Sequence, residues 1–424
     1  MKSLTVYTYA GGPRHRDRYE ATREIFDTVL KTTMGHLSIL SISNLSLDWS
    51  LIRELRILRI SFTASLSLQT VADALARCPR LQIFRYVERE GFRPDVSTVT
   101  TAISLPYLEA LHIQGAVGIC AGLLQSLVNT PRSLKIVISA YELSDVSPIT
   151  SFASLVWDCA FGEDAPLIRL ARISLCPAIF TIGDNALEPS DTRLGIAGHN
   201  FIPRSSQGFD MTGWYAAGGP DEYPNVGFET TTPISAEEEV LSGIFQSWTF
   251  VSATHLDLRG TMTLTSTHLD VLLANLPAVT TIMVRPEETH TLALIEYLRV
   301  HLVVGRRVLS TIIFDAEYVN RSSIEITQGN IAPSSTVNSF ARQNVMQTLL
   351  LCADAARAGM PLDVIEIFNE PQDPTQRLIQ SSQMTDWSEL YEYLEEGFVY
   401  EGVLHSSKPE HDGAERDLFT NVDS

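Results

Sequence analysis

A short apolar pattern recurs along the chain: an apolar residue, two others, an apolar residue, one other, and a third apolar residue. The copies begin at Leu37, Leu55, Leu81 and Leu108, and again at Ala253, Val279, Leu309 and Leu362. Within each group the starts lie 18 to 30 residues apart, except for a last gap of 53 residues. This spacing is close to the repeat length of leucine-rich arrays, and each copy predicts a short strand.

Helical patterns lie between the predicted strands, with apolar residues three and four positions apart over residues 68–75, 123–128 and 265–276. Each pattern is followed by a proline, which prevents the helix from continuing. One strand with one helix cannot bury its apolar face alone, whereas stacked copies share a continuous core. We therefore predict an α/β fold, an irregular leucine-rich-repeat solenoid with parallel strands on its concave face and helices on its convex face. A doubly wound α/β domain is the alternative.

Less regular segments complete the predicted organisation. Further strands are expected at 4–9, 134–138 and 155–157, a helix at 19–30, a hairpin joining 178–183 to 194–198, and a helix at 387–396 before an acidic, disordered tail beyond residue 406. Four regions follow: a first part of the array (1–182), a Gly/Pro-rich insertion (183–235), a second part of the array (236–383), and an acidic C-terminal helix and tail (384–424).

Composition excludes several classes of partner and cofactor. The 31 basic against 50 acidic residues give a net charge of −19, which argues against binding to nucleic acid or to anionic membranes. The five cysteines form no CxxC pair, so neither a disulfide framework nor a zinc cluster is expected. No phosphate-binding loop, HExxH motif, signal peptide or membrane span is found. We expect a cytoplasmic or nuclear protein without metal or cofactor.

One motif suggests chemistry. Residues 118–122 read GxCxG around Cys120, after a predicted strand and before a predicted helix, which is the context of a nucleophile elbow. Asp145 and His199 follow in the order used by some catalytic triads. A hydrolase using Cys120 is therefore the alternative function. Small residues are also what a crowded repeat turn tolerates, so a purely structural role for the motif stays open.

The concave face of the predicted array offers an interaction surface. Residues between the buried strand positions should point to this face, since side chains alternate along a strand. These positions hold Arg59, Arg85, His112, His255, Asp257, Arg259, Met283, Arg285 and Glu366. The arginines could form a partly basic surface for an acidic or phosphorylated peptide. Alternatively they are ordinary solvated residues paired with neighbouring acids.

Three phrases, at residues 72–81, 104–113 and 272–279, resemble the repeat region of the fungal F-box-like leucine-rich-repeat proteins. In that family an N-terminal F-box docks on the Skp1 adaptor of a cullin ubiquitin ligase, and the repeats hold a substrate. The resemblance implies a non-enzymatic module with a protein partner on its concave face, and Skp1 and cullin as further partners. No F-box-like LPxE segment precedes the first strand. An array that opens on an uncapped strand also predicts association at its N-terminal end.

Overall fold

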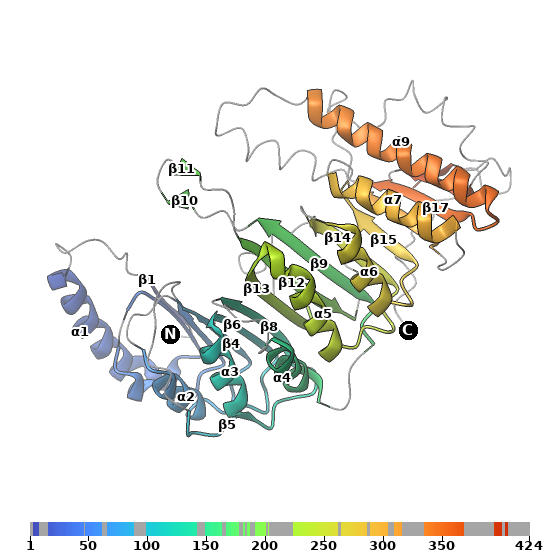
Figure 1. Cartoon of the computed structure of the whole chain (residues 1–424). Coiled ribbons are helices and arrows are strands. Elements are labelled where there is room, and N and C mark those ends of the chain that lie inside the picture. Colours follow the sequence, from blue (N-terminus) through green and yellow to red (C-terminus); the bar gives the residue numbers. More distant parts are fainter. Residues whose placement is uncertain are drawn as a thin grey trace. The chain divides into compact units, whose positions relative to one another are not determined.

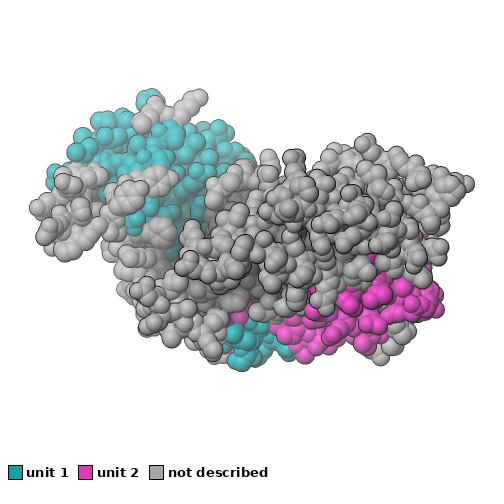
Figure 2. All heavy atoms as spheres, turned by 90° about the horizontal axis from the view of Figure 1, so that it is seen from above, with its two compact units in different colours: residues 1–166, 218–248 teal, residues 167–217, 249–424 magenta. Residues whose placement is uncertain are grey.

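The computed structural model is a mixed α/β protein with a large, mostly parallel sheet and helices (Figure 1). It divides into two compact units, which Figure 2 colours separately: unit 1 comprises residues 1–166 and 218–248, and unit 2 comprises residues 167–217 and 249–424. The structure describes residues 3–7, 16–45, 47–61, 66–88, 99–141, 149–162, 167–177, 181–182, 185–186, 191–200, 202, 224–261, 264–285, 289–303, 309–315, 335–368, 394–400 and 403–405.

The main strands of unit 1 are all parallel and lie in the order β1-β2-β3-β4-β6-β8-β13. They are β1 (Ser3–Tyr7), β2 (Ile39–Ser43), β3 (Ile57–Ser61), β4 (Ile83–Val87), β6 (Ala110–Ala116), β8 (Lys135–Tyr141) and β13 (Val226–Pro233). Two short parallel strands, β5 (Ile103–Ser104) and β7 (Leu127–Val128), pair with each other. Spatial order therefore follows chain order along this sheet.

The main strands of unit 2 lie in the order β12-β9-β14-β15-β16-β17-β18-β19. They are β9 (Leu170–Pro177), β12 (Asp191–His199), β14 (His255–Thr261), β15 (Thr281–Val284), β16 (Thr311–Asp315), β17 (Leu362–Phe368), β18 (Leu394–Tyr400) and β19 (Val403–His405). The pairs from β9 through β18 are parallel, whereas β12 and β19 pair antiparallel at the two ends. A short hairpin joins β10 (Thr181–Ile182) to β11 (Asn185–Ala186).

Helices follow most of the parallel strands and lie on one face of the sheet in each unit (Figure 1). Unit 1 contains α1 (Arg16–Thr33), α2 (Leu68–Ala76), α3 (Val117–Ser126), α4 (Ile149–Phe161), α5 (Glu237–Ser247) and the 3₁₀ turns η2 (Met34–His36), η3 (Trp49–Leu51) and η5 (Ile234–Ala236). Unit 2 contains α6 (Ser266–Asn275), α7 (Thr289–Val303) and α9 (Ser335–Arg357). The sequence signals for α1, α2 and α6 are confirmed, and Thr265 caps α6 in a capping box. The pattern predicted over 123–128 is confirmed only in part, because α3 begins at Val117 and ends at Ser126.

Equivalent positions of the recurring pattern pair in register from strand to strand. The third position of each copy pairs with the third position of the next, from Ile39 through Ile57 and Ile83 to Ala110 in unit 1. The same holds in unit 2 from His255 through Thr281 and Thr311 to Val364. The defining apolar residues of the pattern therefore stack in layers and are buried, and they form the core beneath the helices.

A backbone hydrogen bond also repeats with the pattern. The carbonyl of Ser38 accepts from two successive amides, Arg56 N at 2.8 Å and Ile57 N at 3.0 Å. The equivalent carbonyls of Arg56, Gln82, Arg169, Thr254, Thr280 and Ser310 each accept in the same way from the next strand. Each copy thus leads into its strand with the same backbone geometry, as expected for one unit used repeatedly.

Three predictions about irregular segments are wrong. Residues 155–157 lie inside α4, because a short apolar run cannot by itself distinguish a strand from a buried helix. Residues 194–198 pair antiparallel with β9 rather than with residues 178–183. Residues 394–396 begin strand β18 and are not helical, while residues 387–393 and the acidic tail lie outside the described residues.

The region predicted as a Gly/Pro-rich insertion contains ordered strands. Both β12 and β13 fall within residues 183–235 and belong to the sheet. The intervening residues 203–223 lie outside the described part of the chain. The glycine and proline content of residues 183–235 therefore does not predict a loop over the whole segment.

Candidate functional site

The face of the unit 1 sheet opposite the helices carries a row of basic side chains. Arg59 on β3 pairs in register with Arg85 on β4, and Arg85 pairs with His112 on β6. Adjacent strands lie about 4.8 Å apart, so the side chains of Arg59 and Arg85 project from the same face of the sheet side by side. We call these three residues the arginine row. Three of the side chains predicted for the interaction surface are thus brought together.

Exposure decreases along the arginine row. Arg59 is exposed, Arg85 is half-buried and His112 is 4% exposed. No described residue forms an ion pair or hydrogen bond with Arg59. Burial, with a contribution from the charge of Arg85, holds the pKa of His112 well below its ordinary value, so this imidazole is neutral at pH 7. The positive charge of the row therefore comes from its two arginines.

A cavity of only about 10 Å³ opens at the arginine row, lined by Arg59, Arg85 and His112 together with Ile83, Phe84, Ala110 and Leu111. Such a volume holds about one water molecule. The row is consequently a surface and not a pocket. It suits a segment of chain lying across the strands better than an enclosed small molecule.

The equivalent face of unit 2 does not match the predicted exposed surface. Asp257, Arg259 and Met283 are at most 2% exposed, Arg285 is 8% exposed and Glu366 is 5% exposed. His255 is half-buried, and burial lowers its pKa to about 4. Together with His112 in unit 1, these residues correct the expectation that alternate strand positions are solvated. Apolar side chains occupy the same face, and Leu170, Met283 and Ile313 form a buried cluster there.

Four charged residues in unit 2 form a buried ion-pair network. Asp257 Oδ2 accepts from Arg172 Nε at 2.6 Å and from Arg259 Nη2 at 2.8 Å, and Oδ1 accepts from Arg259 Nε at 3.0 Å. Arg259 Nη1 donates to Asp315 Oδ2 at 2.5 Å. All four side chains are at most 1% exposed, and their charges balance. We call them the Arg172–Asp315 network.

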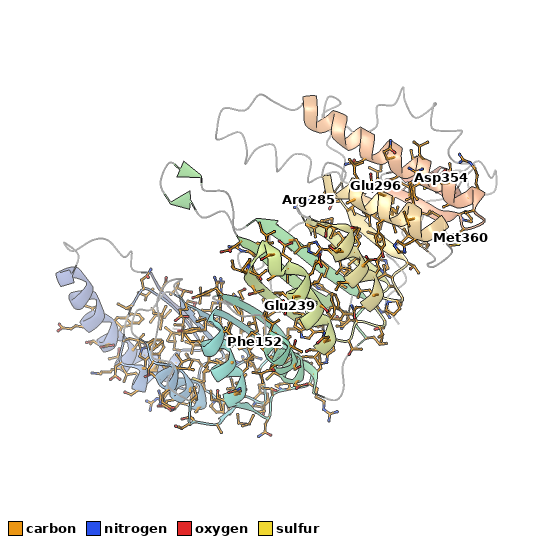
Figure 3. The ribbon with its side chains drawn as sticks, in the orientation of Figure 1. Phe152, Glu239, Arg285, Glu296, Asp354 and Met360 are labelled. Carbon is orange, nitrogen blue, oxygen red and sulfur yellow. The ribbon has the colours of Figure 1, made fainter. Side chains whose placement is uncertain are left out.

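The Arg172–Asp315 network explains why Arg172 and Arg259 are not available to bind a partner protein. Arg172 and Arg259 are each ion-paired with a buried carboxylate, and breaking such a pair leaves an uncompensated charge. Arg285 lies at the end of β15, as labelled in Figure 3, and its backbone oxygen accepts from Thr291. For Arg259, the alternative that the arginines are solvated and paired with acids is right about the acidic partners and wrong about solvation.

The Cys120 motif does not have the geometry of a nucleophile elbow. Strand β6 runs directly into α3, so Cys120 lies within the first turns of the helix and not at the junction. Its side chain is fully buried, and Sγ approaches the carbonyl oxygen of Gly115 at 3.6 Å. Burial, followed by the nearby charge of Glu88, raises the pKa of the thiol far above its ordinary value. A catalytic thiol needs the opposite shift.

The two proposed triad partners give no support either. Asp145 lies outside the described residues. His199 belongs to unit 2 and is 1% exposed, at the end of β12. Neither residue adds support for a catalytic triad at Cys120.

Glu88 is a buried carboxylate that the sequence analysis missed. It is 6% exposed, and its Oε2 accepts from Ala116 N at 3.1 Å and from Tyr141 Oη at 3.3 Å. Ala116 is the N-cap of α3, where a negative charge is favourable. Gly115 permits this approach, since a Cβ there would lie 2.9 Å from Glu88 Oε2. The role of the group is to hold the start of α3.

Cysteine labelling offers a direct check on Cys120. In the native chain we expect Cys120 and Cys78 to resist iodoacetamide at pH 8, because both are buried and burial raises the pKa of Cys78 to about 11. Cys176 is only partly buried and should react first, whereas Cys159, also partly buried, should react more slowly because burial raises its pKa to about 11. Peptide mapping by mass spectrometry measures this order. Rapid, selective alkylation of Cys120 would instead revive the hydrolase alternative.

Metal and membrane features were also sought among the described residues. No group of three or more His, Cys, Asp or Glu side chains in the described ranges could hold a metal ion. Within the same part of the chain, no helix is long and apolar enough to cross a membrane.

No family model matches the chain, and no curated protein is significantly similar to it.

Proposed function

We propose that the chain is a non-enzymatic protein-interaction module that holds an acidic or phosphorylated segment of a partner protein across the arginine row. In this proposal the strands and helices form an irregular leucine-rich-repeat solenoid. The parallel strands present the binding face, and the helices cover the opposite face. The observation that carries the proposal is that Arg59 is exposed, has no ion-pair or hydrogen-bond partner among the described residues, and lies in register with a second arginine on the next strand.

The solenoid interpretation is supported by the repeat register. Equivalent positions pair from copy to copy, and the same carbonyl accepts two amides at each step. A doubly wound domain would reverse its strand order at a switch point and cover both faces with helices. The sheet of unit 1 keeps chain order from β1 to β13, with its helices on one face (Figure 1).

The ligand class follows from the charges of the arginine row. Arg59 and Arg85 are in register on neighbouring strands, which places two guanidinium groups close together. A phosphate or carboxylate can accept from both guanidinium groups, and such charge-assisted hydrogen bonds are among the strongest in proteins. Neutral His112 adds a polar group without further charge. A segment rich in phosphoserine or glutamate is therefore the expected partner.

Binding to phosphopeptides tests this proposal. A library with fixed phosphoserine should be enriched over its unphosphorylated counterpart, and the best peptide should bind the full chain measurably by fluorescence anisotropy. We expect Arg59→Glu to weaken binding roughly tenfold or more, which corresponds to about 1.4 kcal/mol. Raising the salt concentration should also weaken peptide binding by the wild-type chain.

Arg80→Glu is the matched control. Arg80 is exposed in the turn after α2 of the same unit, and its substitution makes the same change of charge. We expect less than about twofold loss of affinity for this variant. Equal losses for Arg59→Glu and Arg80→Glu, or no enrichment of phosphorylated over unphosphorylated peptides, would count against the proposal.

The family resemblance extends the proposal to a ubiquitin-ligase adaptor whose repeats select the substrate. A C-terminally tagged chain purified from its own cells provides the test. Recovery of Skp1 and a cullin supports the adaptor role. Recovery of other proteins without them restricts the function to a stand-alone interaction module.

A further inference from the structure

A second row of side chains lies beside the arginine row on the same face of unit 1. Ile39 on β2 pairs in register with Ile57 on β3, and Ile57 pairs with Ile83 on β4. Ile57 and Ile83 stand two positions before Arg59 and Arg85 on the same strands, so their side chains project from the same face. We call Ile39, Ile57 and Ile83 the isoleucine row.

The isoleucine row is partly open to solvent. Its three side chains are half-buried, whereas apolar side chains at the alternate strand positions, such as Leu58 and Ile60, are fully buried in the core. Ile83 also lines the small cavity at the arginine row together with Arg59 and Arg85. Partly exposed apolar side chains gain when another apolar group covers them. The isoleucine row therefore offers apolar surface directly beside the two guanidinium groups.

The two sides of the arginine row differ in polarity. Two positions after Arg59 and His112 are Ser61 and Gln114, which are polar and half-buried. Val87, at the equivalent position of β4, is only 4% exposed. Among the described residues of β3, β4 and β6, partly exposed apolar side chains therefore flank the arginine row on one side, toward the amino ends of these strands.

We infer that the isoleucine row makes this site selective for a phosphorylated or acidic residue with an aliphatic residue immediately next to it in the partner's sequence. Such selectivity rests on the proposed function and narrows the class of partner that the site takes. Side chains alternate in direction along an extended segment. In a segment lying across the strands, the neighbours of a residue that reaches the arginines therefore point to the other side, toward the isoleucine row.

Charge and apolar surface together select this class of partner. Arg59 is exposed and has no ion-pair or hydrogen-bond partner among the described residues, so a negative group complements it. A purely apolar segment would cover Arg59 without supplying a counter-charge, which is unfavourable. A purely acidic segment would leave Ile57 and Ile83 without apolar contact. A segment that alternates acidic and aliphatic residues meets both requirements.

Paired peptides test the selectivity separately from the binding of phosphate. The probes are a phosphoserine peptide with leucine on both sides of the phosphoserine, the same peptide with serine in place of both leucines, and the unphosphorylated form of each. Fluorescence anisotropy with the full chain measures their affinities. We expect the leucine phosphopeptide to bind roughly fivefold more tightly than the serine phosphopeptide. Each phosphopeptide should bind more tightly than its unphosphorylated form.

Ile57→Thr locates this preference on the isoleucine row. Threonine keeps the branched shape and strand preference of isoleucine but adds a hydroxyl group. The preference for leucine should therefore fall from roughly fivefold to less than about twofold. Binding of the serine phosphopeptide should be unchanged, which would show that the variant folds and keeps its arginine row. Ile83→Thr should act in the same way, and Ile57→Val should retain most of the preference.

Ile234→Thr is the matched control. Ile234 is 51% exposed and lies in η5, which follows β13 at the far end of the strand order of unit 1 from β2 and β3. This variant makes the same change of side chain away from the isoleucine row. We expect it to leave the affinities for both phosphopeptides unchanged.

The outcomes separate the selectivity from the proposed function. Equal affinities for the leucine and serine phosphopeptides would overturn the selectivity alone, as would a leucine preference that survives both Ile57→Thr and Ile83→Thr. Sedimentation velocity of the free chain adds a further check, since a dimer that Ile57→Thr dissociates would assign the isoleucine row to a second copy instead. Equal binding of phosphorylated and unphosphorylated peptides would overturn the proposed function, and the selectivity with it.

Discussion

Replacing Asp257 by alanine is expected to lower the free energy of unfolding by about 3–5 kcal/mol, because it leaves the buried charges of Arg172 and Arg259 without their shared partner. Asp257 accepts three of the four side-chain hydrogen bonds of the Arg172–Asp315 network. It also accepts from the backbone amide of Arg259 at 3.0 Å. Urea denaturation followed by circular dichroism measures the loss.

Asp270→Ala is the control for this substitution. Asp270 lies on α6 in the same unit, has a side chain 62% exposed, and accepts a hydrogen bond from Tyr297. Its loss should cost less than about 1 kcal/mol. Equal effects of the two substitutions would contradict the burial of the network.

The contribution of Asp257 to the free energy of unfolding should decrease as the pH is lowered. Burial alone raises the pKa of this carboxyl, but Arg172 and Arg259 outweigh burial and hold the pKa well below its usual range. A depressed pKa in the folded state means that the stabilisation is present above pH about 4 and is lost as pH falls toward the folded pKa. The penalty of Asp257→Ala should therefore be constant between pH 5 and 7 and shrink only in stronger acid.

Trp248→Ala is expected to destabilise unit 1 by about 3–5 kcal/mol, because it opens a large cavity in a packed aromatic cluster. Trp248 is 2% exposed, and its ring centroid lies 5.8 Å from that of Trp157 and 6.4 Å from that of Phe228. Phe152, labelled on α4 in Figure 3, packs edge-on against Phe228 at 5.7 Å. The cluster joins α4 to the segment that follows α5.

Two further variants separate packing from hydrogen bonding at Trp248. Its Nε1 donates to the carbonyl oxygen of Ala153 at 2.8 Å. Trp248→Phe keeps much of the ring but loses this bond, so we expect a loss of about 1–2 kcal/mol. Tyr107→Ala, at a side chain 62% exposed in the same unit, should cost no more than about 0.5 kcal/mol. The comparison uses urea denaturation, and equal losses at Trp248 and Tyr107 would contradict the account.

The strands could be predicted from the sequence because their signal is local and repeated. Leu55, Leu58 and Ile60 have the same spacing as Leu309, Ile312 and Phe314, and each set is buried at equivalent register positions. A single apolar run without that context was misread, as at residues 155–157 within α4. The recurrence of the pattern identified the strands, whereas a single apolar run did not distinguish a strand from a helix.

The two faces of the sheet could not be predicted with the same rule. Asp257 and Arg259 have the polar character of solvated positions, yet they are buried because Arg172 and Asp315 lie beside them in the fold. A signal was present at the neighbouring alternate positions, where Met283 and Ile313 are apolar. Apolar residues such as Met283 and Ile313, at alternate strand positions expected to be exposed, indicate that this face of the unit 2 sheet is covered.

Arginine labelling of the full chain tests the central claim most directly. Phenylglyoxal should modify Arg59 in the free chain and much less when the selected phosphopeptide is bound, as measured by mass spectrometry. Arg172 and Arg259, each 1% exposed, should remain unmodified in both states. Modification of Arg59 that the bound peptide does not change, or modification of Arg259 at the same rate as Arg59, would contradict the account.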